Sequence, residues 1–392
     1  MPGDEDVTTD PAPGEQPAGG EPAAAEAAAL PPPNRHPILT RGAVVCGVLT
    51  LLVILLEVGP DAFVAGALIA VIPVPLYVVL ALWLDRFEPE PGRVLAQTFA
   101  WGATVAVLIA LVINGVGESM LMETLGPDAA DVLGAIAMAP VVEETAKGLA
   151  LLALFRELKD EFDGVVDGVV YAAMVGLGFA MMENVQYYGA AVAEGAESSV
   201  LTFVVRGMMS PFAHPLFTSL FGIGLGFARE GHHRPGIGRR VFLPAAGFAA
   251  AVGLHSLWNR AALMEGDWFL VLYISVMVPT FCGVLLLIAW SLRREGRVVR
   301  QHLAHLVDEG LLLPDELDTL CGVRRRMLAS FVAWRRGGVT RWRDRRELHR
   351  TASELAFHRW RVVRGLSLGE AADARREAEY LGKLRDLCRR YR

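Results

Sequence analysis

Eight runs of apolar residues, each close to the length that crosses a bilayer, fill the middle of the chain. The hydrocarbon core of a bilayer is about 30 Å thick, so a spanning helix needs about 20 residues. The sequence therefore predicts an all-α protein, a polytopic transmembrane helical bundle of about eight spans. The first run is short, and with the second it could instead form a re-entrant hairpin. The predicted spans are 43–58, 62–84, 97–117, 132–155, 164–190, 201–228, 241–264 and 268–292.

The charged residues divide the chain into three parts. Residues 1–34 contain seven acids and no Lys or Arg, whereas residues 293–392 contain 24 Lys or Arg against 14 Asp or Glu, a net charge of +10. The acidic segment is rich in Pro, Ala, Gly and Glu without periodicity, a composition that buries too little apolar surface to fold. We therefore expect a disordered acidic leader (1–40), a transmembrane core (41–292) and a basic helical cytoplasmic tail (293–392).

Basic residues in the predicted loops indicate the orientation of the bundle. Loops 57–61, 118–131 and 191–200 contain no Lys or Arg, whereas the loops between them all carry basic residues. Cytoplasmic loops of membrane proteins are enriched in Lys and Arg. The pattern predicts a multi-pass protein of the cell membrane (inner or plasma membrane) with both termini cytoplasmic. It argues against an ordinary cytosolic enzyme.

A small set of ionisable side chains lies inside the apolar runs, where a charge is costly unless it is paired. A helix rises about 1.5 Å per residue, which places the set at a common depth of roughly 10 to 20 Å. We therefore expect side chains from four helices to meet in one buried cluster. Two other charged residues are predicted to cap a helix (Asp167) and to extend to the headgroups (Arg206). The clustered set is Glu143, Glu144, Lys147, Glu183, His214 and His255.

The order of these residues resembles that of a known family. The sequence reads Glu143-Glu144-x-x-Lys147, then Gly-Phe179-x-x-x-Glu183-Asn184, then His214, then His255-x-x-x-Asn259. This order resembles the PrsW family of intramembrane metalloproteases. It is more distantly similar to CAAX prenyl proteases and bacteriocin-processing membrane proteases. The resemblance covers about residues 130–262, a third of the chain, and implies that 41–292 is a transmembrane protease core.

Peptide hydrolysis needs an activated water, a polarised carbonyl and a proton donor for the leaving amine. A Zn²⁺ ion held by two His and one carboxylate supplies the first two and keeps one position open. Residue type, depth and order assign Glu183, His214 and His255 as ligands of a divalent metal, with zinc favoured, and Glu143 as the general base. In a metal-free alternative, Glu143 and His214 activate the water unaided.

The remaining polar residues of the motif have supporting roles in this hypothesis. Glu144 pairs with Lys147, three residues later on the same helix, or orients the site from outside the ligand shell. Asn184 and Asn259 are candidate hydrogen-bond donors to the ligands or to the oxyanion. All four residues are therefore included in the predicted catalytic set.

The resemblance implies a membrane-embedded protein substrate, namely a single-span regulator such as an anti-sigma factor, cut near its extracytoplasmic end. The main alternative is a proton- or cation-coupled transporter, because buried Glu, Lys and His also form proton relays. Transporters often contain inverted repeats, and none is evident here. A catalytically silent scaffold is the third possibility.

The basic tail is predicted to be helical in about four pieces, separated at Gly310, at Gly337–Gly338 and at Gly365. Tryptophans stand among its arginines, as in the stretch WRRGGVTRWRDRR at 334–346. Such a segment can lie against anionic lipid or hold a cytoplasmic partner, or it can be a small bundle with a solvated basic face. We expect no nucleic-acid partner, because no recognisable motif accompanies the charge.

Overall fold

The computed structural model describes residues 37–84, 87, 89–158, 162–230, 236–264, 267–365 and 369–391. Nearly all of these residues are helical and none of them forms a strand, so the predicted all-α fold is confirmed. The acidic leader was predicted for residues 1–40, and its first 36 residues lie outside the described part of the chain.

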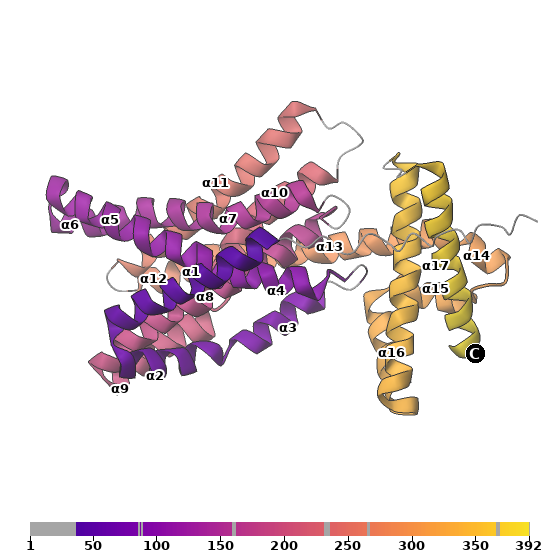
Figure 1. Cartoon of the computed structure of the whole chain (residues 1–392), viewed down its shortest axis with the longest axis horizontal. Helices are drawn as coiled ribbons and strands as arrows, with labels where there is room; N and C mark the ends of the chain where they lie inside the picture. The colour runs from indigo at the N-terminus through magenta and orange to yellow at the C-terminus, as the bar shows by residue number, and fades with distance from the viewer. Residues whose placement is uncertain are drawn as a thin grey trace, which may run out of the picture. The chain divides into compact units, whose positions relative to one another are not determined.

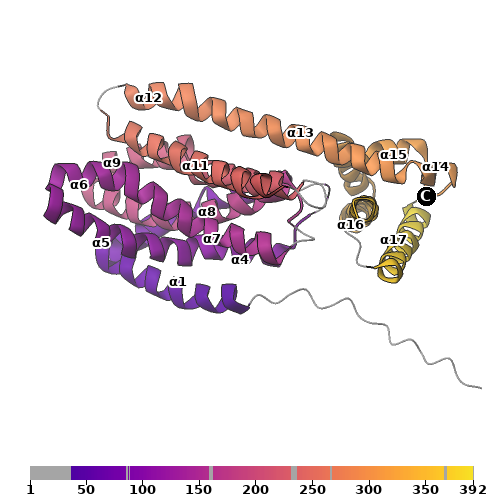
Figure 2. The same cartoon turned by 90° about the horizontal axis from the view of Figure 1, so that it is seen from above.

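The helices follow the predicted apolar runs closely (Figures 1 and 2). Several of them are joined end to end through π-helical turns, labelled η, into longer segments. The elements before residue 200 are α1 (Pro37–Val58), α2 (Pro60–Val71), α3 (Val74–Leu84), α4 (Gly92–Trp101), η1 (Gly102–Ala106), α5 (Val107–Leu125), α6 (Pro127–Leu133), η2 (Gly134–Met138), α7 (Ala139–Glu157) and α8 (Val165–Glu194). The next are α9 (Ala196–Thr202), η3 (Phe203–Met209), α10 (Ala213–Arg229), α11 (Ile237–Ala262), α12 (Trp268–Leu272), η4 (Tyr273–Met277) and α13 (Val278–Leu303). The last are α14 (His305–Asp308), α15 (Pro314–Leu320), α16 (Val323–Val363) and α17 (Glu370–Tyr391).

Six of these helical segments are long and apolar enough to cross a membrane, so the chain is a multi-pass membrane protein. They are Pro60–Leu84, Gly92–Leu125, Val165–Glu194, Ala196–Arg229, Ile237–Ala262 and Trp268–Leu303. Two further predicted spans fall outside this set. The apolar helix at Gly42–Val58 is shorter, and the segment 127–157 carries three charged residues within its apolar stretch. A total of eight spans therefore stays a prediction.

Prolines follow three of the π-helical turns: Pro140 after η2, Pro211 after η3 and Pro279 after η4. Proline has no N–H, and within an α-helix its ring collides with the carbonyl four residues earlier. A wider π turn relieves this crowding, so the segments that contain η2 and η4 continue as helices beyond their prolines. η2 lies little more than one turn before Glu143 and therefore shapes the site described below.

Helix α8 is the central element of the bundle, and its middle turns are almost wholly buried. Small residues let its neighbours approach closely. A Cβ atom on Gly168 would collide with the backbone of Gly222 in α10, and a Cβ on Gly222 would collide with Gly168 in turn. About two helical turns further along α8, a Cβ on Gly176 would lie 2.6 Å from the backbone nitrogen of Pro215. Helices α8 and α10 are thus in direct backbone contact.

The tail breaks at the glycines expected from the sequence. Gly310, Gly338 and Gly365 all have positive φ, of 73°, 64° and 66°. The break at Gly338 folds α16 into two arms, 323–336 and 339–363, because Arg326 donates a hydrogen bond to Ser353 Oγ over 2.8 Å. In an unbroken helix these two residues would lie about 40 Å apart.

Helices α16 and α17 run crosswise to α13 (Figure 1); α16 packs on α13, and α17 packs on α16. Buried apolar residues of the tail form one continuous cluster with those of α8 and α10, which includes Leu355 and Val170. Polar contacts also join the two regions. Arg361 pairs with Asp163 just before α8 over 3.3 Å, and Arg364 donates to the carbonyl of Glu230 after α10 over 2.7 Å.

Gly168→Ala is expected to lower the free energy of unfolding by about 1–3 kcal/mol, the usual cost of overpacking. The added methyl group must push α8 away from α10, although alanine is the better helix former. Gly253→Ala in α11 is the matched control, because a Cβ there meets open space and should leave stability unchanged or slightly raised. Thermal unfolding in detergent measures both. Equal midpoints for the two variants would contradict the close contact.

Candidate active site

Three charged side chains of α7 are buried and belong to the cluster predicted from the sequence. Lys147 is fully buried, and Glu143 and Glu144 are 7% and 1% exposed. The Lys147 ammonium lies 2.8 Å from Glu144 Oε1 and 3.4 Å from Glu143 Oε2. It also sits over the ring of Phe179, 3.8 Å from its centroid, a favourable cation–π position. The pairing of Glu144 with Lys147 predicted from their spacing is therefore present.

His214 in α10 joins this cluster through both ring nitrogens. Its Nδ1 lies 3.0 Å from Lys147 Nζ, and its Nε2 lies 2.8 Å from Glu183 Oε2 in α8. An ammonium group only donates and a carboxylate only accepts. The network therefore assigns the proton of the neutral imidazole to Nε2, with Nδ1 as the acceptor.

His255 in α11 has the opposite arrangement. Its Nδ1 lies 3.1 Å from Glu144 Oε1, so this nitrogen carries the proton and donates it to the carboxylate. Its Nε2 is then an acceptor that lies 3.8 Å from Glu143 Oε2. The ring stacks on Phe217, with centroids 4.8 Å apart, and Glu144 also accepts a hydrogen bond from Thr218 over 2.9 Å. Each imidazole is thus oriented by its own carboxylate.

Arg206 in η3 is a member of the site that the sequence analysis assigned elsewhere. It forms an ion pair with Glu183 and donates through Nε to Asn184 Oδ1 over 2.7 Å, while its guanidinium stacks on Tyr187. The prediction that Arg206 extends to the headgroups is therefore wrong. The signal that could have found it is charge balance, because Lys147 alone cannot neutralise the carboxylates at this depth. Asn184 accepts from Arg206 and so positions it.

Asn259, predicted as a hydrogen-bond donor to the ligands or the oxyanion, donates to a backbone carbonyl instead. Its Nδ2 donates to the carbonyl of Ala135 in η2 over 2.9 Å. In a π-helical turn that carbonyl would be paired with the backbone nitrogen of residue 140, which is proline and has no hydrogen to give. Asn259 therefore satisfies a carbonyl that Pro140 leaves without its usual donor. Asp167, as predicted, caps α8: its carboxylate accepts from the backbone nitrogen of Gly164 over 2.7 Å.

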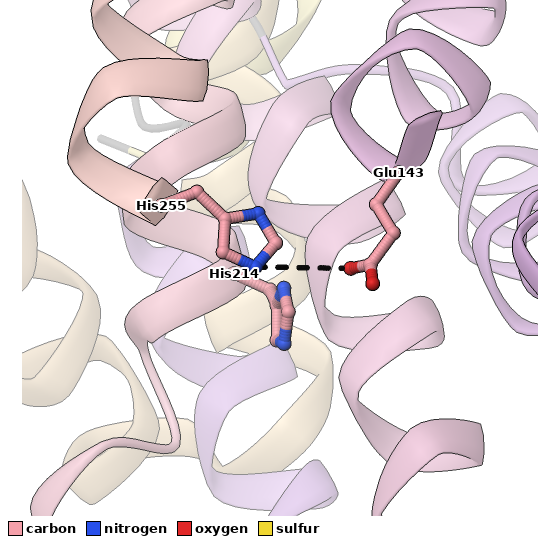
Figure 3. Close-up of side chains that lie close together, drawn as sticks. All are labelled: Glu143, His214 and His255. Atoms are coloured by element: carbon pink, nitrogen blue, oxygen red, sulfur yellow. Dashed lines mark ion pairs between the residues drawn. The ribbon is translucent and has the colours of Figure 1, made fainter. Parts of the chain in front are cut away.

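Glu143, His214 and His255 bring one donor atom each to a common point (Figure 3). These atoms lie within 4.8 Å of one another, come from three helices and are buried. Two imidazoles and a carboxylate are a usual donor set for zinc. In metal sites the other nitrogen of a ligating His typically donates to a carboxylate, as it does in both rings here. The types and spacing of these donors fit a divalent metal ion, which would have to take the place of the Lys147 ammonium that lies 3.0 Å from His214 Nδ1.

The structure places the predicted site residues close together but divides them differently from the sequence-based assignment. Glu183, predicted as a ligand, is engaged by Arg206 and by His214 Nε2. Glu143, predicted as the base, belongs to the triad that can hold an ion. Both carboxylates line a cavity of about 500 Å³ between α5, α7 and α8, whose other walls include Asn114 and Tyr187. A substrate segment entering this cavity would reach the buried cluster.

Fold and site together define a multi-pass α-helical membrane protein with a buried carboxylate–imidazole centre beside a cavity, the class to which intramembrane hydrolases belong. Residues 90–284 match the model of the PrsW family intramembrane metalloprotease. The chain belongs to this family through that segment and is an intramembrane protease, as the resemblance implied. The transporter alternative is not favoured.

Curated relatives agree with this classification. The chain is 28% identical over 184 residues to Protease PrsW of Geobacillus kaustophilus, a match that covers 47% of this chain and 73% of the relative. It is 27% identical over 213 residues to Protease PrsW of Clostridioides difficile, covering 54% and 84%. It is 31% identical over 131 residues to Protease PrsW of Halalkalibacterium halodurans, covering 33% and 53%. No solved structure matches this chain.

Arg206→Gln is expected to destabilise the protein by about 1–3 kcal/mol, because it leaves the half-buried Glu183 carboxylate without its guanidinium partner. Arg206→Lys should lose less, since it keeps the charge but cannot bridge Glu183 and Asn184 as a planar fork does. Arg260→Gln, which changes an exposed arginine of α11, is the control. Thermal unfolding in detergent is the measurement, and an Arg206→Gln midpoint equal to that of the control would contradict the pairing.

Proposed function

We propose that this chain hydrolyses peptide bonds of membrane-embedded protein substrates with a water activated at the Glu143–His214–His255 triad. The observation that carries the proposal is the meeting of three donor atoms within 4.8 Å beside a cavity of about 500 Å³. Family membership supplies the reaction class. The geometry supports the particular residues.

The roles of the surrounding residues follow from their contacts. Glu144 holds the Nδ1–H of His255 and Glu183 holds the Nε2–H of His214, so His255 Nε2 faces Glu143 while His214 Nδ1 faces the Lys147 ammonium. In the metal-free mechanism, Glu143 accepts the proton of the attacking water at the cavity wall. The Lys147 ammonium neutralises Glu144. In the alternative with a divalent ion, zinc by choice of donors, Glu143 would be a ligand together with His214 and His255 and not the base, and the ion would polarise the scissile carbonyl and acidify a bound water.

The substrate class rests on the family and on the depth of the site. We infer that the substrate is a single-span membrane protein, with an anti-sigma-factor-like regulator as the model. The bond that is cut lies toward the extracytoplasmic end of the span, because the cluster occupies the outer half of the predicted bundle. The bilayer itself is the second partner, since the apolar outer faces of the helices need it.

Glu143→Gln is expected to lower the rate of proteolysis by about 10²–10⁴-fold, the usual contribution of a general base, with no loss of folding. The assay follows cleavage of a single-span substrate in detergent or vesicles. The matched control is Glu118→Gln, which removes an acid lining the same cavity outside the cluster and should keep near wild-type activity. Full activity of Glu143→Gln, or an equal loss in both variants, would refute the assignment.

Metal content separates the two possible ligand sets. If Glu143 is the third ligand, Glu183→Gln should retain bound metal while Glu143→Gln, His214→Ala and His255→Ala lose it. If Glu183 is the third ligand, as the sequence analysis assigned it, Glu143→Gln should retain bound metal and Glu183→Gln should lose it. Inductively coupled plasma mass spectrometry on purified protein, with circular dichroism to confirm folding, reads the result. Metal retained by every variant would dismiss both sets and leave the metal-free hypothesis with Glu143 as base.

We also propose that both termini are cytoplasmic, with the protease core at 41–292 and the basic tail at 293–392, because of the basic residues in alternate loops. A reporter fused after Leu125, at the turn between α5 and α6, should then lie outside the cell. A second reporter fused after Tyr391 should lie inside. Reporters found on one common side would invalidate the orientation and, with it, the proposed outer-half depth of the site.

A further inference from the structure

A second cavity, of about 510 Å³, opens between the two arms of α16 and the end of α3. Residues of the first arm, including Met327 and Ser330, face residues of the second arm, including Trp342. Leu82, in the last turn of α3, and Pro89 close one side. Because α3 ends the apolar segment Pro60–Leu84, this cavity lies where a spanning helix leaves the hydrocarbon, at the level of lipid headgroups.

The walls of this cavity are strongly basic. Among the described residues, four arginines and two acids line it, and both acids lie on the second arm. Arg350 and Glu347 have partners of their own, Glu354 and Lys383. Arg343 and Arg346 are exposed at the cavity, and Arg346 stacks on Trp342, 5.0 Å from the ring centroid. These two guanidinium groups are therefore free to turn toward a bound anion.

A buried histidine adds an unused polar atom to this wall. His349 is 6% exposed, and its Nε2 has no hydrogen-bond partner among the residues that the structure describes. Burial, together with the charges of Arg326, Arg345 and Arg346, holds the pKa of His349 well below its usual range. The ring is therefore neutral near pH 7, and a neutral imidazole can place its proton on Nε2 and donate it to an oxygen. A buried polar atom without a partner is rare in folded proteins and calls for one.

We propose that the cavity between the arms of α16 binds a phosphate ester, held by Arg343 and Arg346 with His349 as a neutral donor. Guanidinium groups pair with phosphate oxygens through two parallel hydrogen bonds. The volume suits a ligand far larger than inorganic phosphate, because pockets for small molecules span roughly 300–1,000 Å³. Such an ester can be the headgroup of an anionic phospholipid, which the position beside α3 favours, or a soluble phosphorylated compound. The site is independent of the protease centre.

The test uses the full chain in an uncharged detergent. Binding of phosphatidylglycerol and of phosphatidylcholine, both labelled on the acyl chain, is measured by fluorescence anisotropy, and glycerol 3-phosphate is added as the soluble competitor. The critical variant is Arg343→Gln/Arg346→Gln. The matched control, Arg335→Gln/Arg336→Gln, removes two exposed arginines of α16 that do not line the cavity. His349→Phe tests the buried donor.

The wild type and the control should bind phosphatidylglycerol at least tenfold more tightly than the Arg343→Gln/Arg346→Gln variant, with His349→Phe also weakened. If glycerol 3-phosphate competes but the two lipids bind equally, the natural ligand is a soluble phosphate ester, and this result still supports the proposal. Three results would overturn the proposal: neither probe binds, both lipids bind equally without competition, or the control pair loses as much affinity as the cavity pair. Size-exclusion elution confirms that each variant is folded.

Discussion

The Lys147 ammonium, buried completely within the bundle, is the charge around which the site is arranged. An ammonium group taken out of water costs several kcal/mol unless partners surround it. Lys147 finds them in Glu144 and Glu143 of its own helix and in His214 of α10. His255 of α11 then joins through Glu144. Three helices therefore meet at this depth, because α10 and α11 each place an imidazole against a charged group of α7.

The backbone around Pro140 also helps to bring the site residues together. Pro140 could have ended the helix that carries Glu143, but the π-helical turn η2 carries the chain past it. The widened turn leaves the carbonyl of Ala135 to be satisfied by Asn259. This contact ties α11, and so His255 one turn away, to the segment that contains Glu143. An irregular stretch of backbone thus contributes to the alignment of the acidic and imidazole groups.

Much of this organisation could be predicted from the sequence, and the failures have identifiable causes. The positions of the helices could be predicted from the apolar runs, because backbone groups in the hydrocarbon must form hydrogen bonds within a continuous helix. The pairing of Glu144 with Lys147 followed from their spacing, and the breaks at Gly310 and Gly338 from the freedom of glycine at positive φ. Contacts across helices could not be read in this way. Arg206 lies near the predicted end of a span, where an arginine usually reaches outward, and only the packing of η3 against α8 turns it toward Glu183.

The different roles of Glu143 and Glu183 could not be predicted from the sequence either, because both acids lie at similar predicted depth and residue type does not distinguish them. Their difference lies in what faces them: His255 Nε2 for Glu143, and Arg206 with His214 for Glu183. Rotating α7 or α8 about its own axis would change the groups that its acid faces. The orientation of a helix about its axis depends on side chains of the helices around it. The apolar pattern of that helix alone does not predict it.

The backbone contact between Gly176 and Pro215 has a consequence for the mechanics of the protein. Glu183 lies two turns beyond Gly176 on α8, and His214 directly precedes Pro215 on α10. No compressible side chain separates the two rods at this point, so the spacing between acid and imidazole is set by main-chain atoms. Displacements of about 1 Å can slow an enzyme a hundredfold. Gly176 therefore fixes the distance between two groups of the reaction centre, although it contacts neither of them itself.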